Sequence, residues 1–367
     1  MRHTLASAGT VLRGAPVFAA AFLALSPGAS AQWVIEDKDA SSAIQIGFLA
    51  QPQAEWLETP SGDGYSQNLF LRRFRILFGG HLTEKWSFFF ETDSPNVGKA
   101  NPAGTKDAGT VYIQDALVTY THSAAFKVDV GLQLLPLSHN HEQSAATLLP
   151  VDYGPYTFLE SGPTGERVGR DYGVQVRGYP AKQHLEYRLG VFSGFRGEEA
   201  RNALRVVGRV VFYPWAAETG YFYAGTFQGT KRLLGVGASV DTQKDYHSYG
   251  ADLFYEQPIN GGRQGLTAQV DFVHFDGASS LTSLPGQNTW LFEAGLHLAR
   301  GRITPFVQYA TRDVLDGALP DQDSLQAGLA WWWKGHRRNL KASAGRIRTD
   351  GQPDRVQALV QLQVYYY

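Results

Sequence analysis

Apolar and polar residues alternate with a period of two along most of the chain. From Phe126 to Leu134 every second residue is apolar, and Lys, Asp, Gly and Gln stand between them. The segments 185–191, 290–298 and 356–366 repeat this pattern. Successive side chains of a β-strand point to opposite faces of the sheet, whereas a helix would spread the same apolar residues around all its sides. The alternation therefore predicts strands with one apolar and one polar face.

Short links between these segments alternate with long links that are rich in Gly, Pro, Asn and Asp. This order is typical of an antiparallel barrel with tight turns at one end and long external loops at the other. The stretch 221–228 is interpreted as the start of the strand 232–242, because bacterial single-chain barrels have an even number of strands. The sixteen predicted strands are 44–56, 69–82, 86–93, 111–121, 126–136, 172–179, 185–195, 204–213, 232–242, 249–256, 265–275, 290–299, 303–312, 324–333, 340–349 and 356–367.

Three features favour a membrane barrel over a soluble β-sandwich. The polar faces are rich in small and polar residues such as Gly, Gln, Ser and Asp, aromatic residues such as Trp86 and Trp290 stand at strand ends, and the last strand closes with Tyr365, Tyr366 and Tyr367. A wet interior and two aromatic girdles are properties of outer-membrane barrels. The predicted fold is an all-β, 16-stranded antiparallel transmembrane β-barrel, and a barrel of this size encloses an aqueous channel.

The N-terminus has the order of features of a secretory signal. Arg2 and Arg13 supply positive charge, residues 15–25 form an apolar run, and Ala29-Ser30-Ala31 is a cleavage site of small residues. The sequence thus predicts export, cleavage after Ala31, and a single barrel domain over residues 32–367. Its surroundings would then be outer-membrane lipid and lipopolysaccharide.

Composition narrows the function classes further. The chain has 33 Lys and Arg against 34 Asp and Glu, which gives a formal net charge of −1 and speaks against a nucleic-acid partner. It contains no Cys, so disulfide frameworks, iron–sulfur clusters and cysteine nucleophiles are excluded. No cofactor is expected.

Part of the chain resembles a known family. Leu71-Arg72-Arg73-Phe74-Arg75, continued through Gly79-Gly80 to the run 86–93, resembles the second and third strands of the phosphate-selective porins O and P. The stretch 129–133, followed by Pro136 and a long loop that reaches residues 158–161, is similar to that family's fifth strand and constriction loop. The resemblance is strongest over residues 69–160. It implies a 16-stranded outer-membrane porin that assembles as a homotrimer, and does not by itself imply phosphate as the solute.

The phase of the alternation assigns charged side chains to the lumen, where they would set the selectivity of a channel. The candidate lining residues are Arg73, Arg75, Glu91, Asp93, Lys127, Asp129, Arg188, Arg205, Arg209, Asp252 and Lys341. The longest loop, from Ser138 to Arg170, is the candidate constriction, and the alternative is that it stays outside or contacts a neighbouring subunit. Its candidate residues are His139, His141, Glu142, Asp152, Glu160, Arg167 and Arg170.

The leading hypothesis is an outer-membrane porin through which small hydrophilic solutes diffuse passively, with anions such as phosphate among them. Arg73 and Arg75 either belong to an anion funnel or are partners of nearby acids. The alternatives are a plugged structural or binding barrel and an outer-membrane hydrolase. The hydrolase is disfavoured because Ser343 and His297 fall on the predicted lumen face. A metal site at His139-x-His141-Glu142 is disfavoured because a loop does not fix ligand geometry.

Overall fold

The structure is a computed structural model that describes residues 33–37, 41–157 and 169–367. The predicted signal sequence and its cleavage site lie outside the described residues, as do two of the candidate loop residues, Glu160 and Arg167.

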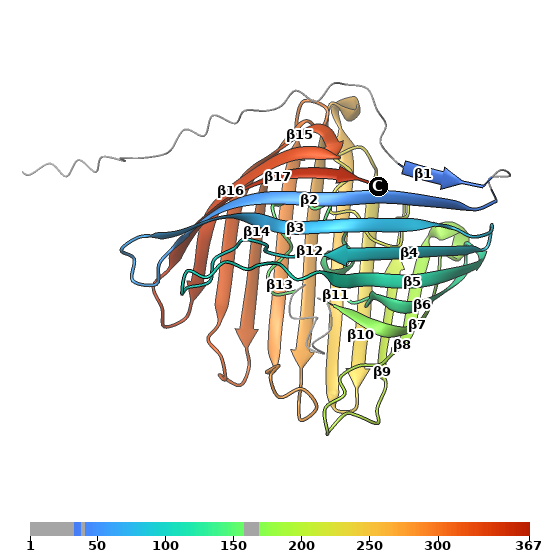
Figure 1. Ribbon diagram of the computed structural model, residues 1–367, viewed down its shortest axis with the longest axis horizontal. Coiled ribbons are helices and arrows are strands. Elements are labelled where there is room, and N and C mark those ends of the chain that lie inside the picture. Colours follow the sequence, from blue (N-terminus) through green and yellow to red (C-terminus); the bar gives the residue numbers. More distant parts are fainter. Residues whose placement is uncertain (1–32, 38–40, 158–168) are drawn as a thin grey trace, which may run out of the picture. The chain divides into compact units, whose positions relative to one another are not determined.

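Sixteen strands of the described chain, β2 to β17, form one closed antiparallel sheet (Figure 1). Each strand pairs with the next, and β17 pairs with β2 to close the barrel. The predicted fold is therefore confirmed. The strands are β2 (Ala43–Glu58), β3 (Tyr65–His81), β4 (Trp86–Asp93), β5 (Tyr112–Ser123), β6 (Phe126–Leu134), β7 (Arg170–Gly178), β8 (Leu185–Phe192), β9 (Arg205–Phe212), β10 (Leu233–Gln243), β11 (Tyr246–Ile259), β12 (Gln264–Asp276), β13 (Gln287–His297), β14 (Ile303–Val314), β15 (Gln322–His336), β16 (Arg338–Thr349) and β17 (Arg355–Tyr366).

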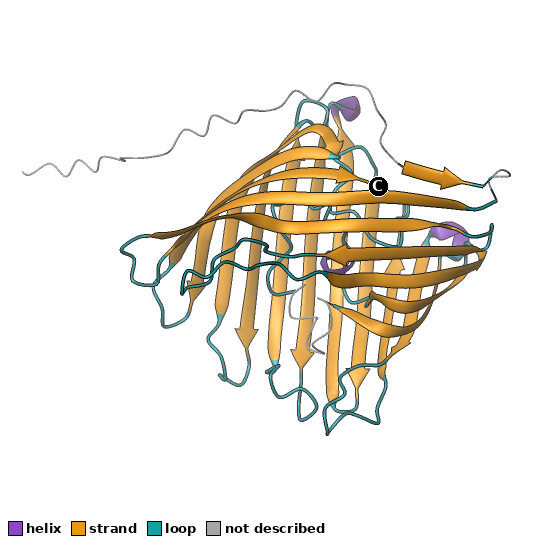
Figure 2. Ribbon diagram, in the orientation of Figure 1, coloured by secondary structure: helices purple, strands orange, loops and turns teal. Residues whose placement is uncertain are grey.

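Strands dominate the described residues, and the helical elements are short (Figure 2). They are α1 (His139–Glu142), η2 (Ala181–Gln183) and η3 (Asn260–Gly262). None of them has the length and apolar character that a membrane-crossing helix needs.

A further short strand, β1 (Trp33–Glu36), pairs with the start of β2, next to the stretch where β17 and β2 close the barrel. It pairs with Ala43–Ile46 of β2, whereas the pairing of β17 with β2 ends at Phe48. The two strands thus occupy successive parts of the same edge of β2.

The two faces of the sheet differ in the way that the alternation predicts. On β3, Phe74 is 41% exposed and Ile76 is also exposed, whereas Arg75 between them is 7% exposed. The exposed apolar side chains form the outer face, where hydrocarbon would replace water, and the buried polar ones face the lumen. At the end of β17, Tyr365 and Tyr367 line a cavity inside the barrel, while Tyr366 stacks against Phe48 with centroids 5.6 Å apart.

The two ends of the barrel are defined here by their links. The start of β2 and the end of β17 lie at one end, which we call the termini end; the opposite end is the loop end. Links 82–85 and 124–125 lie at the termini end, and the longer links 94–111 and 135–169 lie at the loop end. Most links follow the predicted alternation of short and long, but the link 244–245 at the loop end is short and one link at the termini end is long.

The long link at the termini end is 213–232. The interpretation of 221–228 as the start of a strand is wrong, because β10 begins at Leu233 and residues 221–228 form no strand. These residues instead turn into the lumen. A smaller correction concerns Arg170, which was assigned to the constriction loop but is the first residue of β7.

Inside the barrel, apolar side chains pack in separate clusters, and several of these clusters include residues of the link 135–157, which folds into the lumen. Leu148, Ala145 and Ala146 pack with Leu49 and Leu77 of the wall. A second cluster joins the same link to β14, β15 and β17 and consists of Leu149, Val151, Phe306, Ala330, Trp332 and Leu359. The link 135–157 is thereby fixed against the wall at several places.

Candidate functional site

The described part of the long loop, residues 135–157, crosses the lumen. Ser138 caps α1 by accepting a hydrogen bond from the backbone N–H of His141 (3.2 Å), and all residues of the helix are buried. Lys341 of β16 donates to the carbonyl oxygens of Leu148 (2.5 Å) and Pro150 (2.9 Å). These contacts support the predicted constriction: each buried carbonyl group needs a donor, and the wall supplies it.

Further residues on nearby strands and one on the more distant β12 hold the same segment. Gln51 donates to the carbonyl oxygen of Ala145 (3.1 Å), and Gln363 donates to that of Ala146 (2.8 Å). The backbone N–H of Asn140 donates to Asp271 (2.9 Å). The segment is thus attached to β2, β12, β16 and β17 by hydrogen bonds between positions far apart in the chain.

The 213–232 segment enters the lumen from the termini end and meets the 135–157 segment there. Gln143 and Tyr223 form a parallel bridge, in which Tyr223 N–H donates to Glu142 O and Ser144 N–H donates to Tyr223 O (2.9 Å each). A Cβ atom on Gly225 would lie 2.8 Å from the Cα atom of Leu148, so the close approach of the two backbones requires glycine.

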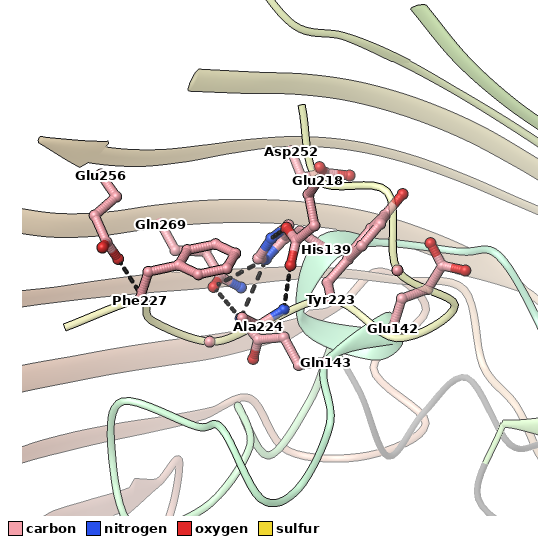
Figure 3. A network of polar contacts seen from close by, with 12 residues as sticks. His139, Glu142, Gln143, Glu218, Tyr223, Ala224, Phe227, Asp252, Glu256 and Gln269 are labelled. Carbon is pink, nitrogen blue, oxygen red and sulfur yellow. Dashed lines mark hydrogen bonds and ion pairs between the residues drawn. The ribbon is translucent and has the colours of Figure 1, made fainter. Parts of the chain in front are cut away.

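His139 stands at the centre of this junction (Figure 3). Its ring stacks on Phe254 (4.1 Å between centroids) and on Tyr223 (5.0 Å). Its Nε2 lies 3.3 Å from Glu218, whose other oxygen accepts the backbone N–H of Ala224. Burial disfavours the imidazolium form, but the hydrogen bond and charge of Glu218, with nearby acids, outweigh it and raise the pKa of His139 above its usual value.

The two β3 arginines predicted to face the lumen, Arg73 and Arg75, are both paired with acids. Arg75 contacts Glu91 (2.5 Å) and Asp93 (2.9 Å) on the neighbouring strand. Arg73 contacts Asp152 of the infolded segment (2.6 Å) and donates to Gln51 (3.0 Å). Although burial alone would favour the neutral acid, Arg72 and Arg73 hold the pKa of Asp152 well below its usual range.

The predicted basic residues of β8 and β9 follow the same rule. Arg188 contacts Glu142 and Glu186, each at 2.6 Å. Arg209 forms a two-point contact with Asp252 (2.5 and 2.8 Å), and Arg205 pairs with Asp241. Such fork-shaped contacts orient the guanidinium groups and leave little of their charge uncompensated.

The remaining predicted residues also lie on the inner face. Asp129 pairs with Arg177 (2.6 Å), and Arg170 with Asp115 (3.1 Å). The ammonium of Lys127 lies 6.0 Å from the ring centroid of Tyr179. His141 is buried, and burial together with nearby arginines holds its pKa well below the usual value. Among the described residues there is no group of three or more ligands that could hold a metal ion.

The hydrolase candidates Ser343 and His297 are not brought together. His297 bonds to Thr267 (2.7 Å) and Thr304 (2.8 Å), whereas Ser343 lines a cavity near Tyr153 and Gln308. A nucleophile needs its base within hydrogen-bond reach, and neither residue has such a partner in the other.

Two cavities lie on either side of the infolded segments. The loop-end cavity, about 310 Å³, is lined by the amides Gln53, Gln308, Gln326 and Gln357 together with charged residues. The termini-end cavity, about 660 Å³, is lined by eight aromatic residues together with polar and charged ones. The infolded segments contribute to the lining of both cavities.

Several residues of the site were missed from the sequence. The alternation of Val174 and Val176 would have placed Arg177 in the lumen, so a signal existed for it. Glu218 and Tyr223 gave no such signal, because they lie on a link whose path depends on contacts with residues about eighty positions away.

A closed barrel with an apolar outer face, a polar lumen and an inward loop at its constriction defines a porin-type channel. No curated protein matches the chain in sequence. The chain belongs to the family of phosphate-selective porins O and P, whose family model matches residues 57–282. It is therefore an outer-membrane porin, and the resemblance seen in the sequence is confirmed.

Solved structures of porins share the fold at low sequence identity. OmpF of Salmonella typhi, in complex with daunomycin, is 12% identical with a TM-score of 0.58, covering 90% of this chain and 100% of that one. The anion-selective porin of Comamonas acidovorans is 13% identical (TM-score 0.55; 89% and 100% covered). OmpT of Vibrio cholerae, described as a trimer form, is 11% identical (TM-score 0.54; 89% and 100% covered). At these identities the likeness shows the fold alone.

Proposed function

We propose that this porin lets small hydrophilic solutes diffuse passively and discriminates weakly between anions and cations. The observation that carries the proposal is the pairing of lumen arginines with acids: Arg75, Arg188 and Arg209 each contact a carboxylate at 2.6 Å or less. A phosphate-selective pore needs cations that are free to replace the hydration shell of the anion. Phosphate is therefore one permeating solute among others rather than the preferred one.

The test is single-channel recording in planar bilayers, with a KCl gradient and then with phosphate in place of chloride. We expect open steps and a reversal potential close to zero. A reversal potential near the equilibrium potential of the anion would contradict weak selectivity.

A second candidate function is a plugged barrel, and the bridge between Gln143 and Tyr223 is the observation that favours it. Two segments that meet inside a lumen can close it. The same recordings separate the two functions, because a plugged barrel gives no steps in membranes that contain correctly folded protein.

We also propose that the protein is a homotrimer. The trimer form of OmpT from Vibrio cholerae has the same fold, and the exposed apolar face offers surface both to lipid and to neighbouring copies. The mass of the protein in detergent, corrected for bound detergent, should be three times that of one chain. A mass of one chain would refute the proposal.

The remaining proposals concern processing and chemistry. We propose that the chain reaches the outer membrane after cleavage between Ala31 and Gln32, which N-terminal sequencing of membrane-extracted protein tests directly. An N-terminus at Met1 would contradict it. We assign the chain no catalytic role, since its family and fold are those of a channel.

A further inference from the structure

The termini-end cavity is lined by an unusual number of aromatic side chains for a water-filled lumen. Eight aromatic residues line it, and the site proposed below involves six of them: Phe89, Tyr221, Phe222, Phe227, Tyr365 and Tyr367. Each is partly exposed rather than buried. The rings come from β4, from the 213–232 segment and from the end of β17, so separate parts of the chain bring them to one place.

The rings are arranged to present both edges and faces. Phe89 meets Phe222 and Tyr367 edge-on, with centroids 5.6 and 5.8 Å apart and interplanar angles of 72° and 73°. Edge-to-face packing is a favoured arrangement of aromatic pairs, and a further ring can pack against this cluster in the same way. Partly exposed apolar faces in water carry a free-energy cost that a bound apolar group removes.

The charges around the cavity are compensated with one exception among the described residues. Glu91 is held by Arg75, Arg177 by Asp129, and Glu218 by His139. No carboxylate of the described chain lies within 4.0 Å of the ammonium of Lys231.

The ammonium of Lys231 donates to the carbonyl oxygen of Ala217 (2.7 Å) and lies 4.6 Å from the centroid of Phe227. The nearby acids Glu218 and Glu256 accept hydrogen bonds from other groups, among them the backbone N–H groups of Ala224 and Phe227. A lysine ammonium has three donors, so Lys231 can still bind an anion.

We propose that this cavity binds small aromatic carboxylates, with the ring of the ligand among Phe89, Phe222 and Tyr367 and its carboxylate on Lys231. The cavity volume lies in the range of small-molecule sites, which combine apolar walls with a few placed polar groups. The proposal rests on the proposed function, because the ligand enters through the lumen.

The loop-end cavity shows that this chemistry is local. Lys99 also lies over a phenyl ring, 5.0 Å from the centroid of Phe70, but it is paired with Glu55 at 2.5 Å. The surrounding wall carries four glutamine amides and half as many aromatic residues as the termini-end cavity. Lys99 is therefore a matched control for Lys231.

The experiment is calorimetric titration of the detergent-solubilised mature protein with benzoate, acetate and benzyl alcohol. Benzoate should bind at least tenfold more tightly than either acetate, which lacks the ring, or benzyl alcohol, which lacks the charge. Lys231→Gln should weaken benzoate binding at least tenfold, and Lys99→Gln should leave it unchanged. Phe222→Leu, which removes a ring and no charge, should also weaken it.

Equal affinity for benzoate and acetate, or unchanged benzoate binding in Lys231→Gln, would overturn the proposal. If that variant does not fold, the comparison of the three ligands and Phe222→Leu still decide. Titration does not require conduction, whereas bilayer recording in KCl without benzoate tests the channel alone. Failure of the binding site and failure of the proposed function therefore give different results.

Discussion

Gln143 and Tyr223 lie side by side in a parallel bridge, although their segments enter the barrel from opposite ends. Parallel pairing of two links inside a lumen leaves each with a free edge, so the bridge depends on side-chain contacts around it. Arg188 supplies one of these, because it donates both to Glu142 and to the carbonyl oxygen of Tyr221 (2.9 Å). The narrow part of the lumen thus has contributions from two segments of the chain rather than one.

Substitution of Gly225 should widen the constriction. In Gly225→Ala the added methyl group would overlap the backbone near Leu148, and overpacking of this kind costs about 1–3 kcal/mol. The two segments should separate, and the single-channel conductance should rise. Gly64→Ala, at a position with open space around it, is the control. Equal conductance of both variants and the wild type would place the bridge outside the conducting path.

Replacement of Arg73 and Arg75 by Gln should shift the reversal potential toward cation preference. The double replacement leaves Glu91 and Asp93 without Arg75 and leaves Asp152 with Arg72 alone, and breaking a buried pair costs about 3–5 kcal/mol. Arg348→Gln, which replaces an exposed arginine beside Asp350, is the control and should change neither the reversal potential nor the stability of the protein. A reversal potential that stays where it was would make the two arginines structural partners only.

The junction at His139 should loosen as the pH rises. Because the pKa of His139 is raised in the folded protein, its stabilising contact with Glu218 is fully present below about pH 6.5 and is lost as the pH rises through the folded value. Hydrogen exchange of the Ala224 amide should therefore accelerate with pH more in the wild type than in His139→Gln. The same acceleration in both proteins would exclude this histidine as the cause.

Loss of Lys341 should increase the fluctuations of the open-channel current. Its ammonium donates to two carbonyl groups of the 135–157 segment, and Lys341→Met leaves both without that donor. A lost buried hydrogen-bond partner costs about 1–3 kcal/mol, so the segment should move more. Lys334→Met, which removes an exposed charge, should leave the current noise as it is. If both variants are as quiet as the wild type, other contacts suffice to hold the segment.

The sequence predicts the face of the sheet to which a side chain points better than it predicts the residues that the side chain contacts. Arg73 and Arg75 could be placed in the lumen because the pleat of a strand fixes the phase of every second residue. That Arg75 meets Glu91 and Asp93 depends on the register between β3 and β4 and on side-chain reach. The pairing of Arg73 with Asp152 depends on where a long link folds, which no local pattern specifies.

The 213–232 segment shows why the rest could not be predicted. Tyr221, Phe222 and Tyr223 have the aromatic character of a strand end, and local preference alone favours that interpretation. In the structure, the rings of these aromatic residues pack against Arg177, Arg188 and Phe89. These contacts join residues that are far apart in the sequence, so no local pattern specifies them.

The seam between the first and last strands of the barrel also bears on assembly. Gln361 donates to Gln53 across the seam, a contact between residues 308 positions apart. Contacts between residues this far apart in the chain form late and slowly. Before the barrel closes, the sheet therefore has two unpaired edges, and such edges can pair with other chains. Pairing of β1 with Ala43–Ile46 needs only a short hairpin, which can form early. This pairing would cover the part of the β2 edge that β17 does not reach. Only the part of the edge that later pairs with β17 would then be open to other chains before the barrel closes.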